Sequence, residues 1–142
     1  LLIEEKLVMV TTDPRGRPPK AADYVYVDWG PEFAAQHAMA YPTLTSAGVT
    51  ASLGPLGREY VLAAGGAGYF RLDVVRRHIE AGRLHRVKGA PEFLYPAYAV
   101  YSEHADAQVV GPALDGLRQV ARPQEPAPAP PPGKPRRRFP SK

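Results

Sequence analysis

Short apolar runs alternate with helical segments of about ten residues along most of this chain. The first run, residues 6–12, is apolar without alternation, which is typical of a strand buried on both faces. Further strands are predicted at residues 24–27, 49–53, 69–70, 84–87 and 94–101, and helices at 31–40, 54–64, 72–81 and 106–121. Strands that alternate with helices predict parallel crossover units and hence an α/β fold.

Three of the predicted helices carry an apolar face, which is the face that a helix usually buries. The helix at 54–64 places Leu56, Tyr60, Val61 and Ala64 on one face, and the helix at 72–81 is amphipathic through Leu72, Val75 and Ile79. The helix at 106–121 has a stripe of Val109, Val110, Ala113, Leu117 and Val120.

Composition divides the 142 residues into a body and a tail at residue 121. Residues 122–142 hold eight of the 17 prolines and carry a net charge of +5, whereas the body carries −1. The tail cannot bury enough apolar surface to fold, so we predict that residues 122–142 are disordered. The basic balance is therefore a property of the tail, and only its Arg136–Arg138 run suggests a nucleic-acid contact.

Several protein classes are excluded by composition. The chain has no cysteine, which excludes disulfide-stapled domains, thiolate zinc sites and cysteine nucleophiles. No apolar run approaches the roughly 18 residues that a membrane helix needs, and the charged start does not resemble a secretory signal. These observations predict a cytoplasmic protein that does not contact a membrane.

The residues that most often carry chemistry are not arranged for it here. The sequence Gly66-Ala67-Gly68 lacks the third glycine of a dinucleotide fingerprint, because Arg71 stands there, and it follows a helix rather than a strand. The histidines, at positions 37, 78, 85 and 104, have no metal-ligand spacing, and no serine lies in a nucleophile-elbow context. We predict neither enzymatic activity nor a metal or cofactor.

The ends of the predicted strands are the best candidates for a binding site. Trp29 lies between a strand end and a helix start, and Ser52 lies at a second such junction. In open α/β sheets ligands bind outside the carboxyl ends of the strands, where helix N-termini favour anions. A structural interpretation is equally open, with Trp29 as a core anchor and Ser52 as a helix N-cap.

Taken in order, several segments resemble one protein family. They are LLIEEKLVMVTT at the start, DYVYVDWGPEF at 23–33, REYVLAAGGAGYFR at 58–71, DVVRRHIEAGRLHRV at 73–87, and PAYAVY followed by ALDGLR within 96–118. No single segment is specific, but the ordered set resembles the C-terminal effector-binding domain of LysR-type transcriptional regulators. The resemblance spans residues 1–121.

That resemblance implies a two-lobed α/β fold like that of type 2 periplasmic binding proteins. This chain would supply lobe two, about residues 20–95, together with the closing strand and helix of lobe one. Such bacterial regulators bind a small, often anionic effector between their lobes, bind promoter DNA through an N-terminal helix-turn-helix, and assemble as dimers or tetramers. On this resemblance, the DNA-binding domain and most of lobe one would lie outside this sequence.

The resemblance also assigns roles to particular residues. The effector-binding candidates are Trp29, Gly30, Thr50, Ser52, Leu53 and Arg71, and the dimer-interface candidates are Phe33, His37 and Val49. Arg71 departs from the family pattern, which often has proline there, and either pairs with an anionic effector or is a solvated residue at a helix start. For Phe33, a position in the core is the alternative to the dimer interface. For the whole chain the alternative is a free-standing solute-binding or partner-binding module without DNA-binding activity.

Overall fold

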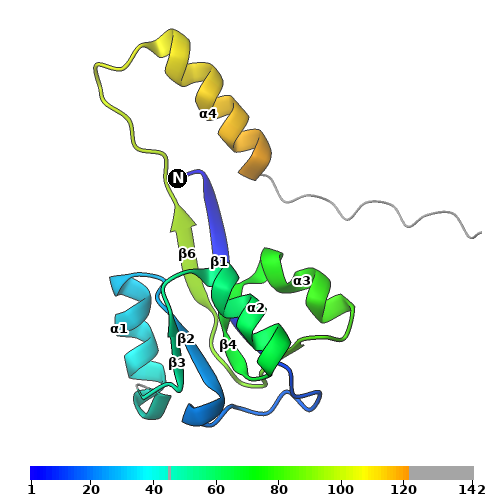
Figure 1. Cartoon of the computed structure of the whole chain (residues 1–142). Coiled ribbons are helices and arrows are strands. Elements are labelled where there is room, and N and C mark those ends of the chain that lie inside the picture. Colours follow the sequence, from blue (N-terminus) through cyan, green and yellow to red (C-terminus); the bar gives the residue numbers. More distant parts are fainter. Residues whose placement is uncertain (45, 122–142) are drawn as a thin grey trace, which may run out of the picture.

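The computed structural model describes residues 1–44 and 46–121 (Figure 1). Its elements, in chain order, are β1 (Ile3–Thr11), the short 3-10 helix η1 (Ala21–Asp23), β2 (Tyr24–Val27), α1 (Pro31–Ala40), η2 (Pro42–Leu44), β3 (Val49–Ala51), α2 (Gly54–Ala64), β4 (Ala67–Arg71), α3 (Leu72–Glu80), β5 (His85–Arg86), β6 (Phe93–Ala97) and α4 (Ala107–Ala121). The alternation of strands and helices agrees with the prediction. The tail predicted to be disordered lies outside the described residues.

The strands form one mixed sheet, and the parallel crossover units that the alternation predicts make up only part of it. Its order is β3-β2-β4-β1-β5, with β6 paired to β1. Strands β2, β3 and β4 are parallel, as expected, but β1 is antiparallel to β4, β5 and β6. The reason is that Thr11 and Tyr24 both lie opposite Ala67, so β1 ends at the edge of the sheet where β2 begins. No helix carries the chain back, and β2 therefore runs the opposite way.

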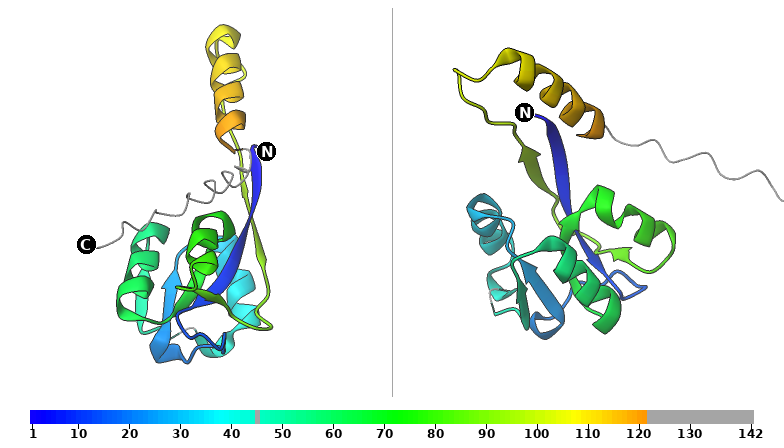
Figure 2. Two further views of the ribbon diagram at one scale, coloured as in Figure 1. Left: turned by 90° about the vertical axis from the view of Figure 1, so that its right-hand side faces the viewer. Right: turned by 45° about the horizontal axis from the view of Figure 1, so that its top comes forward.

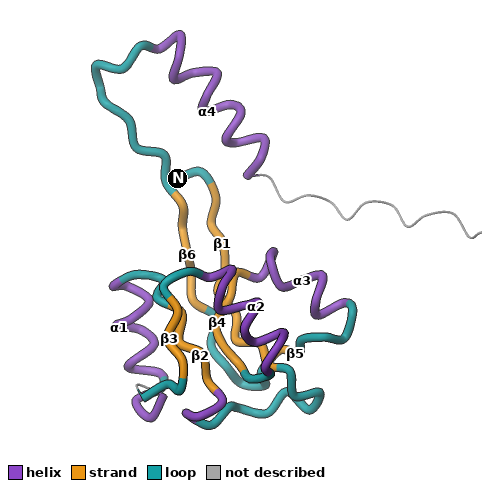
Figure 3. The backbone as a smooth tube through the Cα atoms, in the orientation of Figure 1, coloured by secondary structure: helices purple, strands orange, loops and turns teal. Residues whose placement is uncertain are grey.

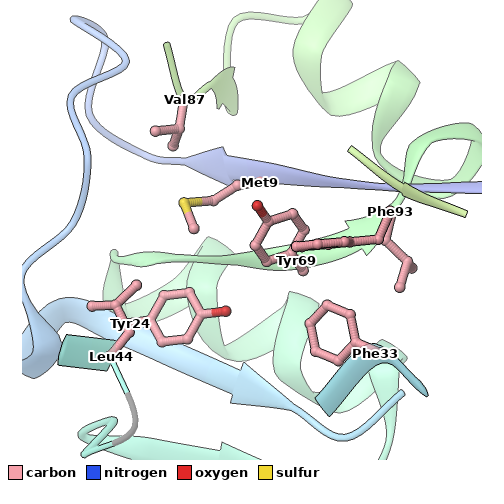
Figure 4. Packing of buried hydrophobic residues seen from close by; sticks show 8 residues of the cluster. Met9, Tyr24, Phe33, Leu44, Tyr69, Val87 and Phe93 are labelled. Atoms are coloured by element: carbon pink, nitrogen blue, oxygen red, sulfur yellow. The ribbon is translucent and has the colours of Figure 1, made fainter. Parts of the chain in front are cut away.

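Strand β1 forms the centre of the body, and its apolar run is buried on both faces as predicted. Leu7, Val8, Met9 and Val10 are each at most 2% exposed. Because side chains alternate along a strand, Leu7 and Met9 join one core cluster and Val8 and Val10 join the other. Figure 4 shows the first cluster, in which Met9 lies beside an aromatic group that includes Tyr69.

Helix α1 covers the face of the first cluster, and helices α2 and α3 cover the opposite face (Figures 2 and 3). The predicted buried side of α2 is partly wrong. Leu56 and Tyr60 are 57% and 46% exposed, whereas Val61 and Gly57 are buried. A Cβ atom on Gly57 would lie 2.8 Å from Cγ2 of Val27, so the missing side chain lets α2 approach the sheet on that side.

The first half of β1 pairs with β6 as a two-stranded ribbon that leaves the body, and α4 lies beyond it (Figures 1 and 2). Strand β6 ends at Ala97 rather than at the predicted residue 101, because Ala97 lies opposite Ile3, the first residue of β1. The predicted strand at 84–87 likewise shortens to His85–Arg86. The apolar stripe of α4 is largely exposed: Val109, Leu117 and Val120 are 66%, 49% and 83% exposed, and α4 has no buried residue.

An imidazole lies in the middle of the first core cluster. The Nε2 atom of His37 is 2.8 Å from the hydroxyl of Tyr24, and the two rings are stacked with centroids 5.5 Å apart. The rings of Tyr26, Phe33 and Tyr41 lie within 5.6 Å of the same imidazole. Burial lowers the pKa of His37 below its ordinary value of 6.5, because the charged form would lose its hydration.

This burial makes stability depend on pH. The unfolded chain takes up a proton on His37 near pH 6.5, and the folded chain only at lower pH, so the free energy of unfolding falls as the pH drops below 6.5. We expect the midpoint of urea unfolding to decrease between pH 7.5 and 5, and His37→Gln to flatten that decrease. The matched control His104→Gln, at a ring that is 88% exposed, should leave it unchanged. If the urea midpoint falls equally with pH in the parent and in both variants, His37 is not the group responsible.

Candidate functional site

The predicted binding residues meet at one edge of the sheet. Trp29 and Gly30 follow β2, Ser52 and Leu53 follow β3, and Arg71 ends β4. Since these three strands are parallel, their carboxyl ends lie at the same edge. The ribbon of β1 and β6 leaves the body at this edge (Figure 3). We call it the carboxyl edge.

Trp29 is a core anchor at the carboxyl edge. Its indole Nε1 donates a hydrogen bond of 3.0 Å to the carbonyl oxygen of Tyr69. The half-buried ring packs against both core clusters and lies edge-on to Tyr95 of β6, with centroids 5.2 Å apart. Trp29 is therefore a core anchor, as the structural interpretation of the sequence has it. A role of its exposed part in ligand binding stays a prediction.

The ring of Trp29 also covers the first residue of α2. A Cβ atom on Gly54 would overlap Cη2 of Trp29, so the indole fits there only because position 54 is glycine. The expectation that Ser52 is the N-cap of α2 is wrong. Leu53 occupies the cap without a side-chain hydrogen bond, and Ser52 is exposed. The hydroxyl of Ser52 is therefore free of a capping role.

A shallow apolar groove runs between the edge strand β3 and helix α2. Its volume is about 340 Å³, and its lining includes the three predicted residues Thr50, Ser52 and Leu53 together with Leu56 and Tyr60. A larger polar hollow of about 820 Å³ lies at the opposite edge of the sheet, lined by residues that include Thr11, Lys20 and Asp23. We place the candidate site at the carboxyl edge, because that is where the predicted residues gather.

Arg71 has a partner that the sequence analysis missed. Its Nη2 donates to Oε1 of Glu5, and its Nε lies against Oε2 of the same carboxylate. Arg71 is therefore neither a free anion receptor nor merely a solvated residue at the start of α3. The signal for Glu5 was its position two residues before Leu7 and four before Met9, which predicts that all three share one side of β1.

The three predicted interface residues differ in their exposure. Phe33 and His37 are 4% and 2% exposed, so their side chains are enclosed by this chain's own core. The core alternative for Phe33 holds, and an interface at α1 would use exposed side chains such as Met39 instead. Val49 is half-buried in the edge strand β3. The interface itself stays a prediction.

Among residues 1–44 and 46–121, no group of three or more acidic or histidine side chains is placed to hold a metal ion. No helix in the described part of the chain is long and apolar enough to cross a membrane.

Solved structures identify this arrangement. The regulatory domain of HypT from Salmonella typhimurium superposes with a TM-score of 0.56 and 17% sequence identity, covering 84% of this chain and 64% of that domain. Full-length LysG from Corynebacterium glutamicum matches with a TM-score of 0.56 and 14% identity, covering 84% of this chain and 43% of LysG. A matching full-length HypT is described as a LysR-type transcriptional regulator. The chain has the fold of LysR-type regulatory domains.

This fold confirms the resemblance read from the sequence and the expected likeness to periplasmic binding proteins. The chain spans less than two thirds of the HypT regulatory domain and less than half of LysG. No protein-family model matches the chain, and neither does any curated protein. The LysR-type fold is therefore visible in the arrangement of elements rather than in overall sequence identity.

The contact between Trp29 and Gly54 leads to a specific prediction. Gly54→Ala should force the indole away from the first turn of α2 and lower the free energy of unfolding by about 1–3 kcal/mol. Because Trp29 is the single tryptophan, its fluorescence emission should shift to longer wavelength as the ring gains water. In the control Gly111→Ala, the added Cβ meets nothing within 4 Å. This variant should neither lower the free energy of unfolding nor shift the Trp29 emission. An unshifted emission in Gly54→Ala would contradict the contact.

Proposed function

We propose that this chain is the effector-sensing part of a LysR-type DNA-binding transcription regulator. The observation that supports the proposal is the carboxyl edge itself. Three parallel strand ends, an anchored indole and a paired Arg71 lie where the β1–β6 ribbon leaves the body. In this proposal residues 20–95 form lobe two, and a small molecule binds between the carboxyl edge and a second lobe.

The ribbon explains how binding would reach the DNA. A ligand held by both lobes favours the arrangement in which they are close, and it shifts the equilibrium only by its difference in affinity for the two arrangements. In this proposal strands β1 and β6 connect the body to the second lobe, so they would transmit the change in lobe orientation. Promoter DNA would be contacted by a helix-turn-helix domain outside this sequence.

Two matching structures support a small polar ligand. One HypT regulatory domain is described as bound to bromide, and one LysG structure contains its effector Arg. Both are properties of those proteins. For this chain they support a ligand that needs hydrogen-bonding and charged groups, which Ser52, Thr50 and Arg71 would supply.

A partner-binding module without DNA-binding activity is the alternative. It is favoured by the apolar side chains exposed beside the β3–α2 groove, among which Leu53 and Leu56 are 62% and 57% exposed. Exposed apolar surface of this kind commonly marks an interface. A free-standing solute-binding module is a further form of the same alternative.

The proposal is tested by screening the full chain against a panel of small metabolites for a rise in melting temperature. At least one compound should stabilise the chain through the part of the site that the carboxyl edge supplies by itself. Ser52→Ala should weaken its binding about fivefold, which corresponds to the loss of one hydrogen bond of roughly 1 kcal/mol. Ser102→Ala, in the segment after β6, serves as the control and should bind normally. A panel with no stabilising compound would argue against effector sensing and for the partner-binding alternative.

Self-association is the second part of the proposed function. We propose that α1 and the edge strand β3 face a second copy, as the predicted interface at Val49 implies. Met39 of α1 is 85% exposed and is placed for such a contact. Met39→Glu should convert a dimer to a monomer in size-exclusion chromatography with light scattering, whereas Val100→Glu, at a residue 93% exposed elsewhere, should not. A dimer in both variants would place the interface elsewhere.

A further inference from the structure

A buried carboxylate lies at the carboxyl edge. Glu5 is 7% exposed, and it is the one acidic side chain that is buried among residues 1–44 and 46–121. It lies on β1 where this strand leaves the body, directly opposite Tyr95 of β6. Burying a carboxylate is unfavourable unless a cation and hydrogen bonds compensate for the lost hydration.

Arg71 supplies that compensation, and the two partners differ in their exposure. Leu7 lies opposite Arg71 on β4, so Glu5 is one pleat further along the same side of β1. The side chain of Arg71 is 41% exposed, while that of Glu5 is 6% exposed. The neighbouring Lys6 is held by Glu92 at 2.9 Å. Glu5 therefore depends on Arg71, while the Arg71 side chain keeps part of its surface open to a ligand.

This asymmetry decides which charges a ligand can bring. A simple anion that displaces Glu5 from Arg71 leaves the Glu5 carboxylate buried without its cation. A simple anion that binds Arg71 beside Glu5 gains little attraction, because the net charge of the pair is zero. A simple cation meets the same neutral pair. A molecule with a positive and a negative group close together satisfies both partners, because its anion binds the outer guanidinium and its cation adds a donor to the carboxylate.

We propose that the Glu5–Arg71 pair selects a zwitterionic effector with the headgroup of an α-amino acid, which is narrower than the small, often anionic effector that the family resemblance implies. Tyr95 lies opposite Glu5 on β6, and its ring is edge-on to that of Trp29, so these two rings would provide apolar surface for the remainder of the molecule. Glu5 acts as a specificity-determining residue in this arrangement. The inference rests on the proposed effector-sensing function and names its ligand class.

The test compares matched compounds on the full chain by isothermal titration calorimetry. L-phenylalanine, L-leucine and L-arginine are each measured beside the same molecule without its amino group (phenylpropanoate, isocaproate, guanidinovalerate) and without its carboxylate (phenethylamine, isoamylamine, agmatine). At least one amino acid should bind roughly tenfold more tightly than both of its truncated forms, since each truncation removes one charge-assisted hydrogen-bonded group.

Variants of the pair separate selectivity from folding. Glu5→Gln should remove most of the preference for the amino acid over the amine-free carboxylate, and Arg71→Gln should abolish binding of both. Glu5→Asp keeps the charge one carbon shorter, so it should retain the preference with weaker affinity. Circular dichroism and melting curves identify any variant that does not fold. Glu92→Gln, which alters ion pairs with Lys6 and Arg86 away from the Glu5–Arg71 pair, is the control and should bind like the parent.

Two results would overturn the inference while leaving effector sensing intact. The first is equal affinity for an amino acid and its amine-free carboxylate, with both lost in Arg71→Gln, because the site would then take simple anions. The second is the absence of amino-acid binding to a chain that another metabolite stabilises. If no metabolite of the wider panel binds at all, the proposed function itself fails.

Discussion

Burial of β1 on both faces is the constraint on which the rest of the structure depends. Four consecutive side chains from Leu7 to Val10 are removed from water, and they divide between two core clusters on opposite sides of the sheet. A strand of this kind needs neighbours along both edges and helices over both faces. The chain provides β4 on one edge, β5 and β6 on the other, and α1 opposite α2 and α3. Strand β2 pairs with β4, and β3 pairs in turn with β2.

Sequence reasoning locates the elements well because each depends on local signals. The apolar run of β1, the proline at the start of α1 and the glycines after α2 each mark an element or its end without reference to the rest of the fold. Strand direction is different, since it depends on which edge of the sheet the chain has reached. The antiparallel pairing of β1 was therefore missed. The buried side of α2 was misjudged for a related reason, because the absent side chain of Gly57 outweighs the apolar stripe.

The candidate site shows the same division. The strand ends and the residues that follow them were predictable, because the carboxyl edge is a general property of parallel strands. The partners of those residues were not. Arg71 and Glu5 are 66 positions apart, and no spacing rule connects them until the register of β1 and β4 is known. In the same way, the sequence marks Gly54 only as the start of a helix, and its contact with the indole of Trp29 appears only in the structure.

Strand β1 precedes all of its partner strands in the sequence, and this order has a kinetic consequence. Its partners are β4, β5 and β6, so the pairs that complete the sheet join residues 3–11 with residues 67–97. Contacts between such distant parts of a chain form slowly, because closing a long loop costs entropy before any contact compensates for it. During synthesis on the ribosome this apolar segment emerges before all three of its partner strands. Until they emerge, its unpaired edges are open to other chains, and this interval is when the protein would be most dependent on chaperones.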